Sequence, residues 1–136
     1  MPLVRIDVHQ SYSVGQTTTI ANEVHEAIVE VFGIPERDKF QVVNRLAPGS
    51  LVAEDAGLGF ERTSGVVVIQ IFTQRGRAAD LKQKLYKRIA ERLALVGVAG
   101  ADVFIGYVEN GPEDWSFGYG KAQYLTGELA IPSARA

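Results

Sequence analysis

Pro2 is the first residue of the sequence that could do chemistry. It follows the initiator Met1, and an initiator methionine before proline is normally removed, which would leave Pro2 with a free secondary amine. An α-amino group has a pKa of about 8, well below that of lysine. It can therefore accept or donate a proton near neutral pH, and it can add to a carbonyl carbon as a nucleophile. Because Met-Pro is a common start, the case for a catalytic Pro2 depends on the rest of the chain.

Two arginines form the second chemically suggestive feature. Arg75 and Arg77 are separated by Gly76 and follow the apolar run 66–72. In α/β folds ligands gather at the carboxyl ends of strands, where two guanidinium groups could clamp a carboxylate with bidentate hydrogen bonds. The alternative is a solvated turn before a helix, although two cations at a helix N-terminus would oppose its dipole.

The sequence contains few residues that could form a metal site, a reactive thiol or a nucleotide-binding loop. There is no cysteine among the 136 residues, which excludes disulfides, thiolate metal sites and cysteine nucleophiles. One of the two histidines, His25, begins a segment like a zinc-protease helix, but Val29 stands where the second histidine is required. The glycine motifs lack the spacing of phosphate-binding loops. We therefore expect no metal and no cofactor.

Charge and hydropathy narrow the range of partners. The net charge is −2, without the clustered basic face typical of nucleic-acid binding. No apolar run approaches the roughly 20 residues that span a bilayer, and the N-terminus lacks the pattern of a signal peptide. We therefore expect a cytoplasmic protein that binds neither nucleic acid nor a membrane.

Hydrophobic periodicity predicts four strands and two helices. The strands are expected at about 3–8, 40–43, 66–72 and 102–108. The helices are expected at about 17–32, capped by Thr17 or Thr18 and stopped at Gly33, and at about 78–95. The Gly- and Pro-rich stretch 47–64 between them is expected to form loops and a short hairpin.

This order predicts a single α/β (α+β) domain, 1–136, built from two consecutive β-α-β units. The halves are about 1–46 and 65–109, followed by a C-terminal arm, 110–136. Two such units would make a four-stranded, mainly parallel sheet with both helices on one face. The other face then needs a cover, and in so short a chain the plausible cover is another subunit.

The arm mixes aromatic residues and glycines. It holds the single tryptophan, Trp115, together with Phe117, Tyr119 and Tyr124. The arm could only cover hydrophobic surface, which its composition slightly favours, or its aromatic side chains could wall a pocket.

The sequence as a whole resembles the tautomerase superfamily, and within it the malonate semialdehyde decarboxylases. An amino-terminal proline on a doubled β-α-β block carries the superfamily resemblance, and four stretches carry the closer one: 35–40, 55–60, 102–104 and above all 109–118. The resemblance covers essentially the whole chain. It implies a tautomerase-like fold, a homotrimer and cofactor-independent decarboxylation of malonate semialdehyde (3-oxopropanoate), a small carboxylate-bearing substrate, to acetaldehyde and CO2.

The same resemblance implies a set of site residues. The catalytic proline corresponds to Pro2 and the catalytic aspartate to Asp38, while the substrate-binding aromatics correspond to Trp115 and Phe117. An ungapped comparison places residues 74 and 76, a glutamine and a glycine, at the family's arginine positions. We predict that Arg75 and Arg77, each displaced by one position, serve as the arginine pair.

Two alternatives remain open. The same scaffold could tautomerise, hydrate or dehalogenate another small oxo or unsaturated acid, although the cis-chloroacrylate dehalogenases use a carboxylate where Trp115 stands. Alternatively, the chain could be a non-catalytic trimeric binding module, and retention of Met1 would favour this because it caps the amine.

Overall fold

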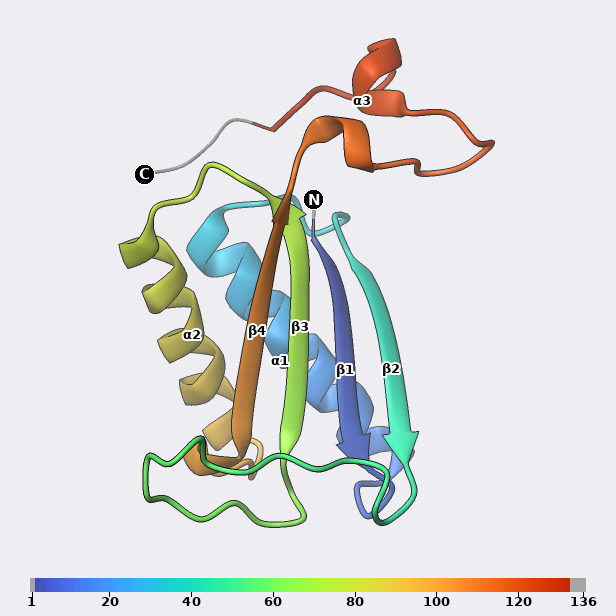
Figure 1. The fold of residues 1–136 in the computed structure, drawn as a ribbon. Helices are drawn as coiled ribbons and strands as arrows, with labels where there is room; N and C mark the ends of the chain where they lie inside the picture. Colours follow the sequence, from blue (N-terminus) through green and yellow to red (C-terminus); the bar gives the residue numbers. More distant parts are fainter. Residues whose placement is uncertain (1, 133–136) are drawn as a thin grey trace.

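A computed structural model of the protein describes residues 2–132. Met1 and the last four residues of the predicted arm, 133–136, lie outside the described residues. The chain folds into a four-stranded sheet, two long helices and a short helical arm (Figure 1). The elements are β1 (Leu3–His9), α1 (Val14–Phe32), β2 (Phe40–Leu46), β3 (Val67–Gln74), α2 (Ala79–Ala94), η1 (Gly100–Asp102), β4 (Val103–Asn110), η2 (Pro112–Asp114) and α3 (Gln123–Thr126).

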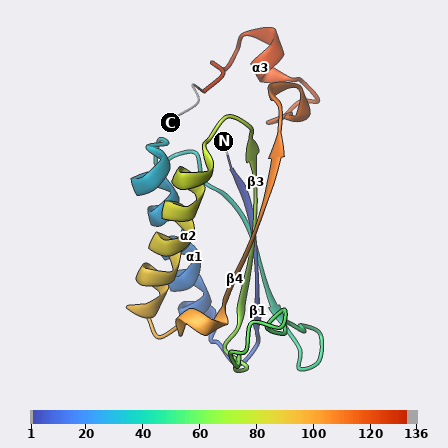
Figure 2. The same cartoon turned by 60° about the vertical axis from the view of Figure 1, so that its left-hand side comes forward.

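The sheet has the order β2-β1-β3-β4. Within each half the strands are parallel, β1 with β2 and β3 with β4, whereas the two halves join through the antiparallel pair β1–β3. This confirms the predicted fold class of two β-α-β units in a mainly parallel sheet. Both long helices lie on one face of the sheet, as the turned view shows (Figure 2).

The helix α1 forms where polar capping and an apolar stripe coincide. The Ser13 side chain accepts a hydrogen bond from the Gln16 backbone, and the Gln16 side chain accepts one from the Ser13 backbone, which makes a capping box. At the other end Gly33 adopts a left-handed φ of 66°, a conformation that favours glycine. The predicted cap at Thr17 or Thr18 is wrong, because this capping box starts the helix several residues earlier.

The core lies between the helices and the sheet. Alternate residues of β1 and β3 point toward the helices and are fully buried, as are the apolar stripes of both helices. The principal core side chains are Val4, Ile6, Val8, Ile69, Ile71, Val24, Ile28, Leu85, Ile89 and Leu93.

Within residues 2–132, no helix or strand packs on the opposite face of the sheet (Figure 2). Its exposed apolar side chains include Phe40, Val42, Phe104 and Val108, whose exposed fractions lie between 39% and 47%. None of the helices described is both long and apolar enough to cross a bilayer.

The connection between β2 and β3 contains no strand within the described residues 47–66, so the predicted hairpin is wrong. Side chains rather than strand pairing satisfy its backbone. Arg62 donates to the carbonyl oxygens of Glu54 and Ala101 at 2.9 and 2.7 Å, and the buried Asp102 accepts the Thr63 backbone N–H at 2.7 Å. The loop runs below the end of the sheet that lies farthest from the N-terminus (Figure 1).

Candidate active site

The start of β1 lies at the end of the sheet above which the C-terminal arm runs (Figure 1), and Pro2 is the residue that precedes β1. The next residue, Leu3, pairs with Phe40 at the start of β2 and with Phe72 near the end of β3. Pro2 is buried. Because Val4 and Ile6 face the helices, strand alternation also places Pro2 on the helix side of the sheet. Pro2 therefore lies beside the start of β2 and the end of β3, and it is not among the residues that line the cleft described below.

Asp38 is held in the tight turn that leads into β2. Its backbone N–H donates to the Pro35 carbonyl oxygen at 3.0 Å, and its side chain is half-buried. Asp38 precedes Phe40, the partner of Leu3, by two residues. The turn thus brings this carboxylate to the same end of the sheet as Pro2.

Arg77 lies over the end of α1. Its guanidinium carbon is 4.2 Å from the centroid of the Phe32 ring, and its Nη1 donates to the Thr73 hydroxyl at 3.3 Å. Its Nε is buried and meets no hydrogen-bond partner within residues 2–132. Arg77 is therefore positioned by stacking and one weak hydrogen bond, which leaves donors available to an anion.

Asp38 and Arg77 line one cleft of about 360 Å³, together with Tyr124. The end of α1 and the segment after α3 supply the rest of the lining, which is mostly apolar: Phe32, Gly33, Ile34, Pro35, Leu129, Ala130, Ile131 and Pro132. A negative, a positive and a neutral polar group thus meet in a largely apolar cleft.

Tyr124 is a polar residue of this cleft that the sequence analysis counted only among the arm aromatics. Its side chain is buried, and its hydroxyl group has no hydrogen-bond partner in the part of the chain that the structure describes. Burial, reinforced by the negative charge of Asp38, raises the pKa of Tyr124 to about 12. The hydroxyl therefore stays protonated at neutral pH and can donate to a ligand oxygen.

Gln74 is a second buried donor that the sequence analysis passed over. It is the last residue of β3, pairs with Asn110 of β4 and is 7% exposed. Its Nε2 lacks a partner among the described residues, and buried polar groups are rarely left unpaired without a reason. The sequence feature that could have identified Gln74 is that it stands at one of the family's arginine positions.

The structure separates the two predicted arginines. Arg75 is not part of the cleft lining; its Nη2 lies 3.6 Å from Oε1 of Glu113 in the arm, and both side chains are more than half exposed. Its backbone N–H donates to the Asn110 carbonyl oxygen at 2.8 Å, which prolongs the β3–β4 pairing by one residue. Arg77 alone of the pair reaches the cleft.

The predicted aromatic residues form a cluster next to Tyr124. The rings of Trp115 and Phe117 stack with centroids 5.9 Å apart, and Phe117 meets the Tyr124 ring edge-on at 5.2 Å. Trp115 is anchored by a 2.9 Å hydrogen bond from its Nε1 to Oδ1 of Asn110. Phe117 also contacts Phe40 of β2 at 5.9 Å, so the cluster both covers the end of the sheet and supports one wall of the cleft.

A group of potential metal ligands occurs elsewhere, in His25, Glu26 and Glu36. Nε2 of the buried His25 lies 2.9 Å from the Glu36 carbonyl oxygen. That contact makes Nε2 a hydrogen-bond donor rather than a metal ligand. His25 thus joins α1 to the turn before β2 through this hydrogen bond.

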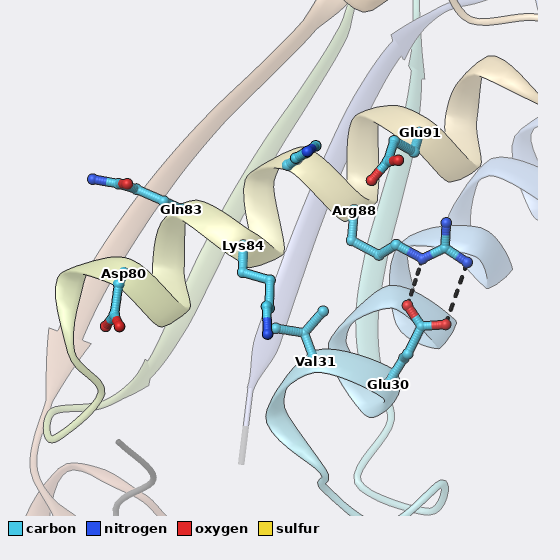
Figure 3. A pocket seen from close by; sticks show the side chains of 8 residues that line it. Glu30, Val31, Asp80, Gln83, Lys84, Arg88 and Glu91 are labelled. Atoms are coloured by element: carbon cyan, nitrogen blue, oxygen red, sulfur yellow. Dashed lines mark hydrogen bonds and ion pairs between the residues drawn. The ribbon is translucent and has the colours of Figure 1, made fainter.

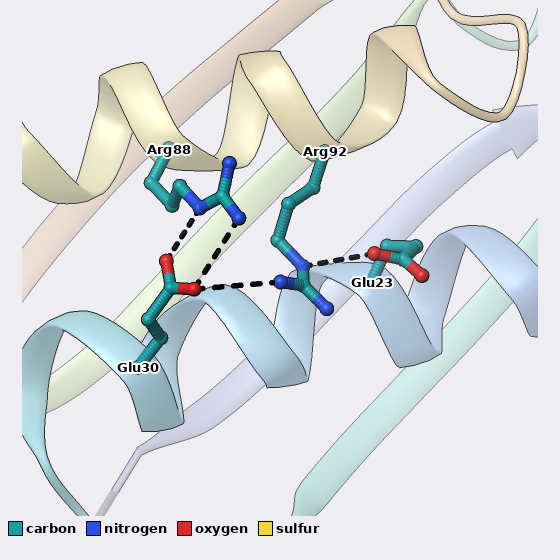
Figure 4. A network of polar contacts seen from close by, with 4 residues as sticks. All are labelled: Glu23, Glu30, Arg88 and Arg92. Atoms are coloured by element: carbon teal, nitrogen blue, oxygen red, sulfur yellow. Dashed lines mark hydrogen bonds and ion pairs between the residues drawn. The ribbon is translucent and has the colours of Figure 1, made fainter.

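A larger groove, of about 660 Å³, lies between α1 and α2 and contains none of the predicted site residues (Figure 3). Its arginine, Arg88, is paired with Glu30. This pair belongs to a network in which Arg92 bridges Glu30 and Glu23 at 3.6 and 2.8 Å (Figure 4). Ion pairs between α1 and α2 therefore connect the two helices beside this groove.

Comparison with known proteins identifies the family. A family model described as tautomerase enzyme matches residues 38–118, and a second of the same description matches residues 2–61. The chain belongs to the tautomerase family. Two relatives in Bacillus subtilis (strain 168) bear this out: probable tautomerase YrdN is 39% identical over 95% of this chain and 100% of its own length, and probable tautomerase YusQ is 32% identical over 92% and 99%.

Solved structures of similar proteins include two malonate semialdehyde decarboxylases. The FG41 enzyme, inhibited by 3-bromopropiolate, is 55% identical with a TM-score of 0.92 and covers 96% of this tautomerase and 99% of its own chain. A second malonate semialdehyde decarboxylase is 36% identical with a TM-score of 0.88, over 94% and 99%. A fused 4-OT that forms a symmetric trimer is 17% identical with a TM-score of 0.74. The match covers 92% of this chain and 98% of the fused 4-OT chain, so the two proteins share the fold.

Proposed function

We propose that this tautomerase decarboxylates malonate semialdehyde to acetaldehyde and CO2 with the Pro2 amine, after removal of Met1. The observation that carries the proposal is the 55% identity to a malonate semialdehyde decarboxylase across 96% of the chain. The cleft supports it, because Asp38, Arg77 and Tyr124 offer the polar groups that a small oxo acid requires.

Loss of CO2 from a 3-oxo acid requires an acceptor for the electron pair of the breaking carbon–carbon bond. The aldehyde oxygen accepts it if protonated Pro2 donates a hydrogen bond, and an iminium accepts it if Pro2 first condenses with the aldehyde. In both routes C2 then takes a proton. Acetaldehyde leaves directly in the first route, and in the second it is freed when water hydrolyses the iminium and restores the Pro2 amine. Asp38, as a nearby negative charge, would favour the protonated amine or position a water molecule.

The substrate carboxylate needs a partner that holds it out of the plane of the carbonyl group. Arg77 is our candidate because it reaches the cleft, whereas Arg75 is paired with Glu113. Tyr124 is a further candidate, since its buried hydroxyl group lines the cleft and has no hydrogen-bond partner among the described residues. Trp115 and Phe117 would keep water from the carboxylate as its charge is lost.

The uncovered sheet face supports a homotrimer. Contiguous exposed apolar surface of this kind marks interaction sites in proteins, and the fused 4-OT relatives of the same fold are trimers. We propose that two further copies of this chain cover the face, and that the enzyme acts in the cytoplasm.

A substrate panel tests the proposed activity. We expect malonate semialdehyde to be turned over with the highest kcat/KM, measured by CO2 release, in comparison with phenylpyruvate and the chloroacrylates. Absence of enzymatic CO2 release would contradict the proposal. Faster ketonisation or enolisation of phenylpyruvate would favour the second candidate, a tautomerase, which the names of the two Bacillus subtilis relatives support.

N-terminal mass analysis tests the non-catalytic alternative. We expect a mature chain that begins with Pro2. A chain that keeps Met1 would have a capped amine and would favour a trimeric binding module.

A further inference from the structure

The cleft is larger than a three-carbon acid requires. Its volume is about 360 Å³, whereas clefts of about 300–1,000 Å³ hold drug-sized ligands. A substrate as small as malonate semialdehyde would leave most of this space to water. The cleft therefore has room for a substituent beyond the reacting groups.

The lining of the cleft suits an apolar substituent. Two separate segments supply apolar side chains, Phe32, Ile34 and Pro35 at the end of α1 and Leu129, Ala130 and Ile131 after α3. The side chains of Leu129 and Ile131 are 36% and 53% exposed. A ligand with an apolar tail would remove this surface from water, and each methylene so buried strengthens binding about fourfold.

We propose that the cleft takes 3-oxo acids that carry an alkyl or aryl group on the oxo carbon, and that Ala130 and Ile131 set the size limit. This inference rests on the proposed decarboxylation. The bond between C2 and the carboxylate carbon breaks, its electron pair passes toward the oxo group, and C2 takes one proton. The products are CO2 and a methyl ketone in place of acetaldehyde.

A homologous pair of substrates tests the proposal. Acetoacetate and 3-oxohexanoate have the same reacting groups, and the second adds two methylenes. We expect kcat/KM for enzymatic CO2 release, corrected for the spontaneous rate, to be roughly tenfold higher for 3-oxohexanoate. Equal values for the two acids would overturn the inference.

A cleft-filling substitution tests the size limit. Ala130 is exposed, so A130W should fold. It should lower kcat/KM for 3-oxohexanoate about tenfold and lower kcat/KM for malonate semialdehyde by a smaller factor, because the smaller acid needs less of the cleft. The matched control is L125A, since Leu125 is exposed on α3 and lies outside the cleft lining. This variant should leave kcat/KM unchanged for both substrates.

The outcomes separate this inference from the proposed function. One outcome is that A130W, shown by circular dichroism to be folded, lowers kcat/KM equally for both substrates while wild type decarboxylates malonate semialdehyde. The size limit is then wrong and the proposed function stands. If wild type decarboxylates none of the acids, both are wrong. The inference is supported if the wild-type enzyme has a higher kcat/KM for 3-oxohexanoate than for acetoacetate and the A130W variant does not.

Discussion

At the scale of single residues, Arg75 and Arg77 illustrate what alternation along a strand does not reveal. They are two positions apart in sequence, yet Arg75 pairs with Glu113 of the arm whereas Arg77 stacks on Phe32 and lines the cleft. The sequence predicts arginines at this end of the sheet, but their directions depend on the turn after β3 and on the arm, which local patterns do not specify.

The separation of the two arginines leads to a paired prediction. R77A should lower kcat/KM for malonate semialdehyde about 100-fold, since a charged hydrogen bond to the carboxylate is lost. R75A should change it less than about threefold, because exposed ion pairs contribute little. Steady-state CO2 release measures both. A larger loss in R75A than in R77A would contradict the assignment of Arg77 to the carboxylate.

Tyr124 carries a second prediction, which includes a pH dependence. Y124F keeps the ring packed against Phe117 but removes the hydroxyl group, which has no hydrogen-bond partner among residues 2–132. We expect kcat/KM to fall roughly 10- to 100-fold. Because the pKa of Tyr124 is raised to about 12, the hydroxyl is protonated throughout the neutral and mildly alkaline range.

The pH–rate profile of Y124F should therefore keep the wild-type shape at a lower level. Loss of an alkaline limb in Y124F, measured from kcat/KM against pH, would show that Tyr124 titrates in this range and would contradict its role as a permanent donor.

At the scale of elements, the strands and helices follow from periodicity, whereas their ends and connections follow from side-chain contacts. Alternation in β1 and the helical stripe of α1 predict both elements, and both are confirmed. The start of α1 and the path of the loop 47–66 were missed. They depend on Ser13 with Gln16, and on Arg62 with Asp102, which are contacts that periodicity does not describe.

The capping box at Ser13 gives a prediction for stability. S13A should lower the free energy of unfolding by about 1 kcal/mol, because it removes the acceptor for the Gln16 backbone N–H. The control is T18A, one turn into the helix, where an exposed hydroxyl only donates to the Val14 carbonyl oxygen; we expect less than about 0.5 kcal/mol. Urea denaturation compares the two, and a larger loss in T18A would contradict the observed helix start.

At the scale of the whole molecule, one face of the sheet presents exposed apolar side chains on which no helix packs within the described residues. The sequence predicts this face, because two helices on one side of a four-stranded sheet leave the other side free. The site was less predictable at this scale. Pro2, Asp38, Arg77 and Tyr124 come from the two halves and the arm, and only the complete topology brings these segments to one end of the sheet.

The proposed trimer is testable on this face. V108D places a carboxylate on the side of β4 that faces away from the helices, where the side chain is 47% exposed, so we expect the single chain to fold with it. We expect sedimentation of a monomer or dimer, because burial of an unpaired charge in an interface is unfavourable. L95D, at the exposed end of α2, should remain a trimer. Sedimentation of V108D as an intact trimer would contradict the assignment of this face.

The central claim, that the Pro2 amine performs the reaction, is tested most directly by the rate of malonate semialdehyde decarboxylation in P2A. We predict a fall in kcat of about 100-fold or more in a protein whose circular dichroism and sedimentation match wild type. A folded P2A that decarboxylates malonate semialdehyde at the wild-type rate would contradict the account.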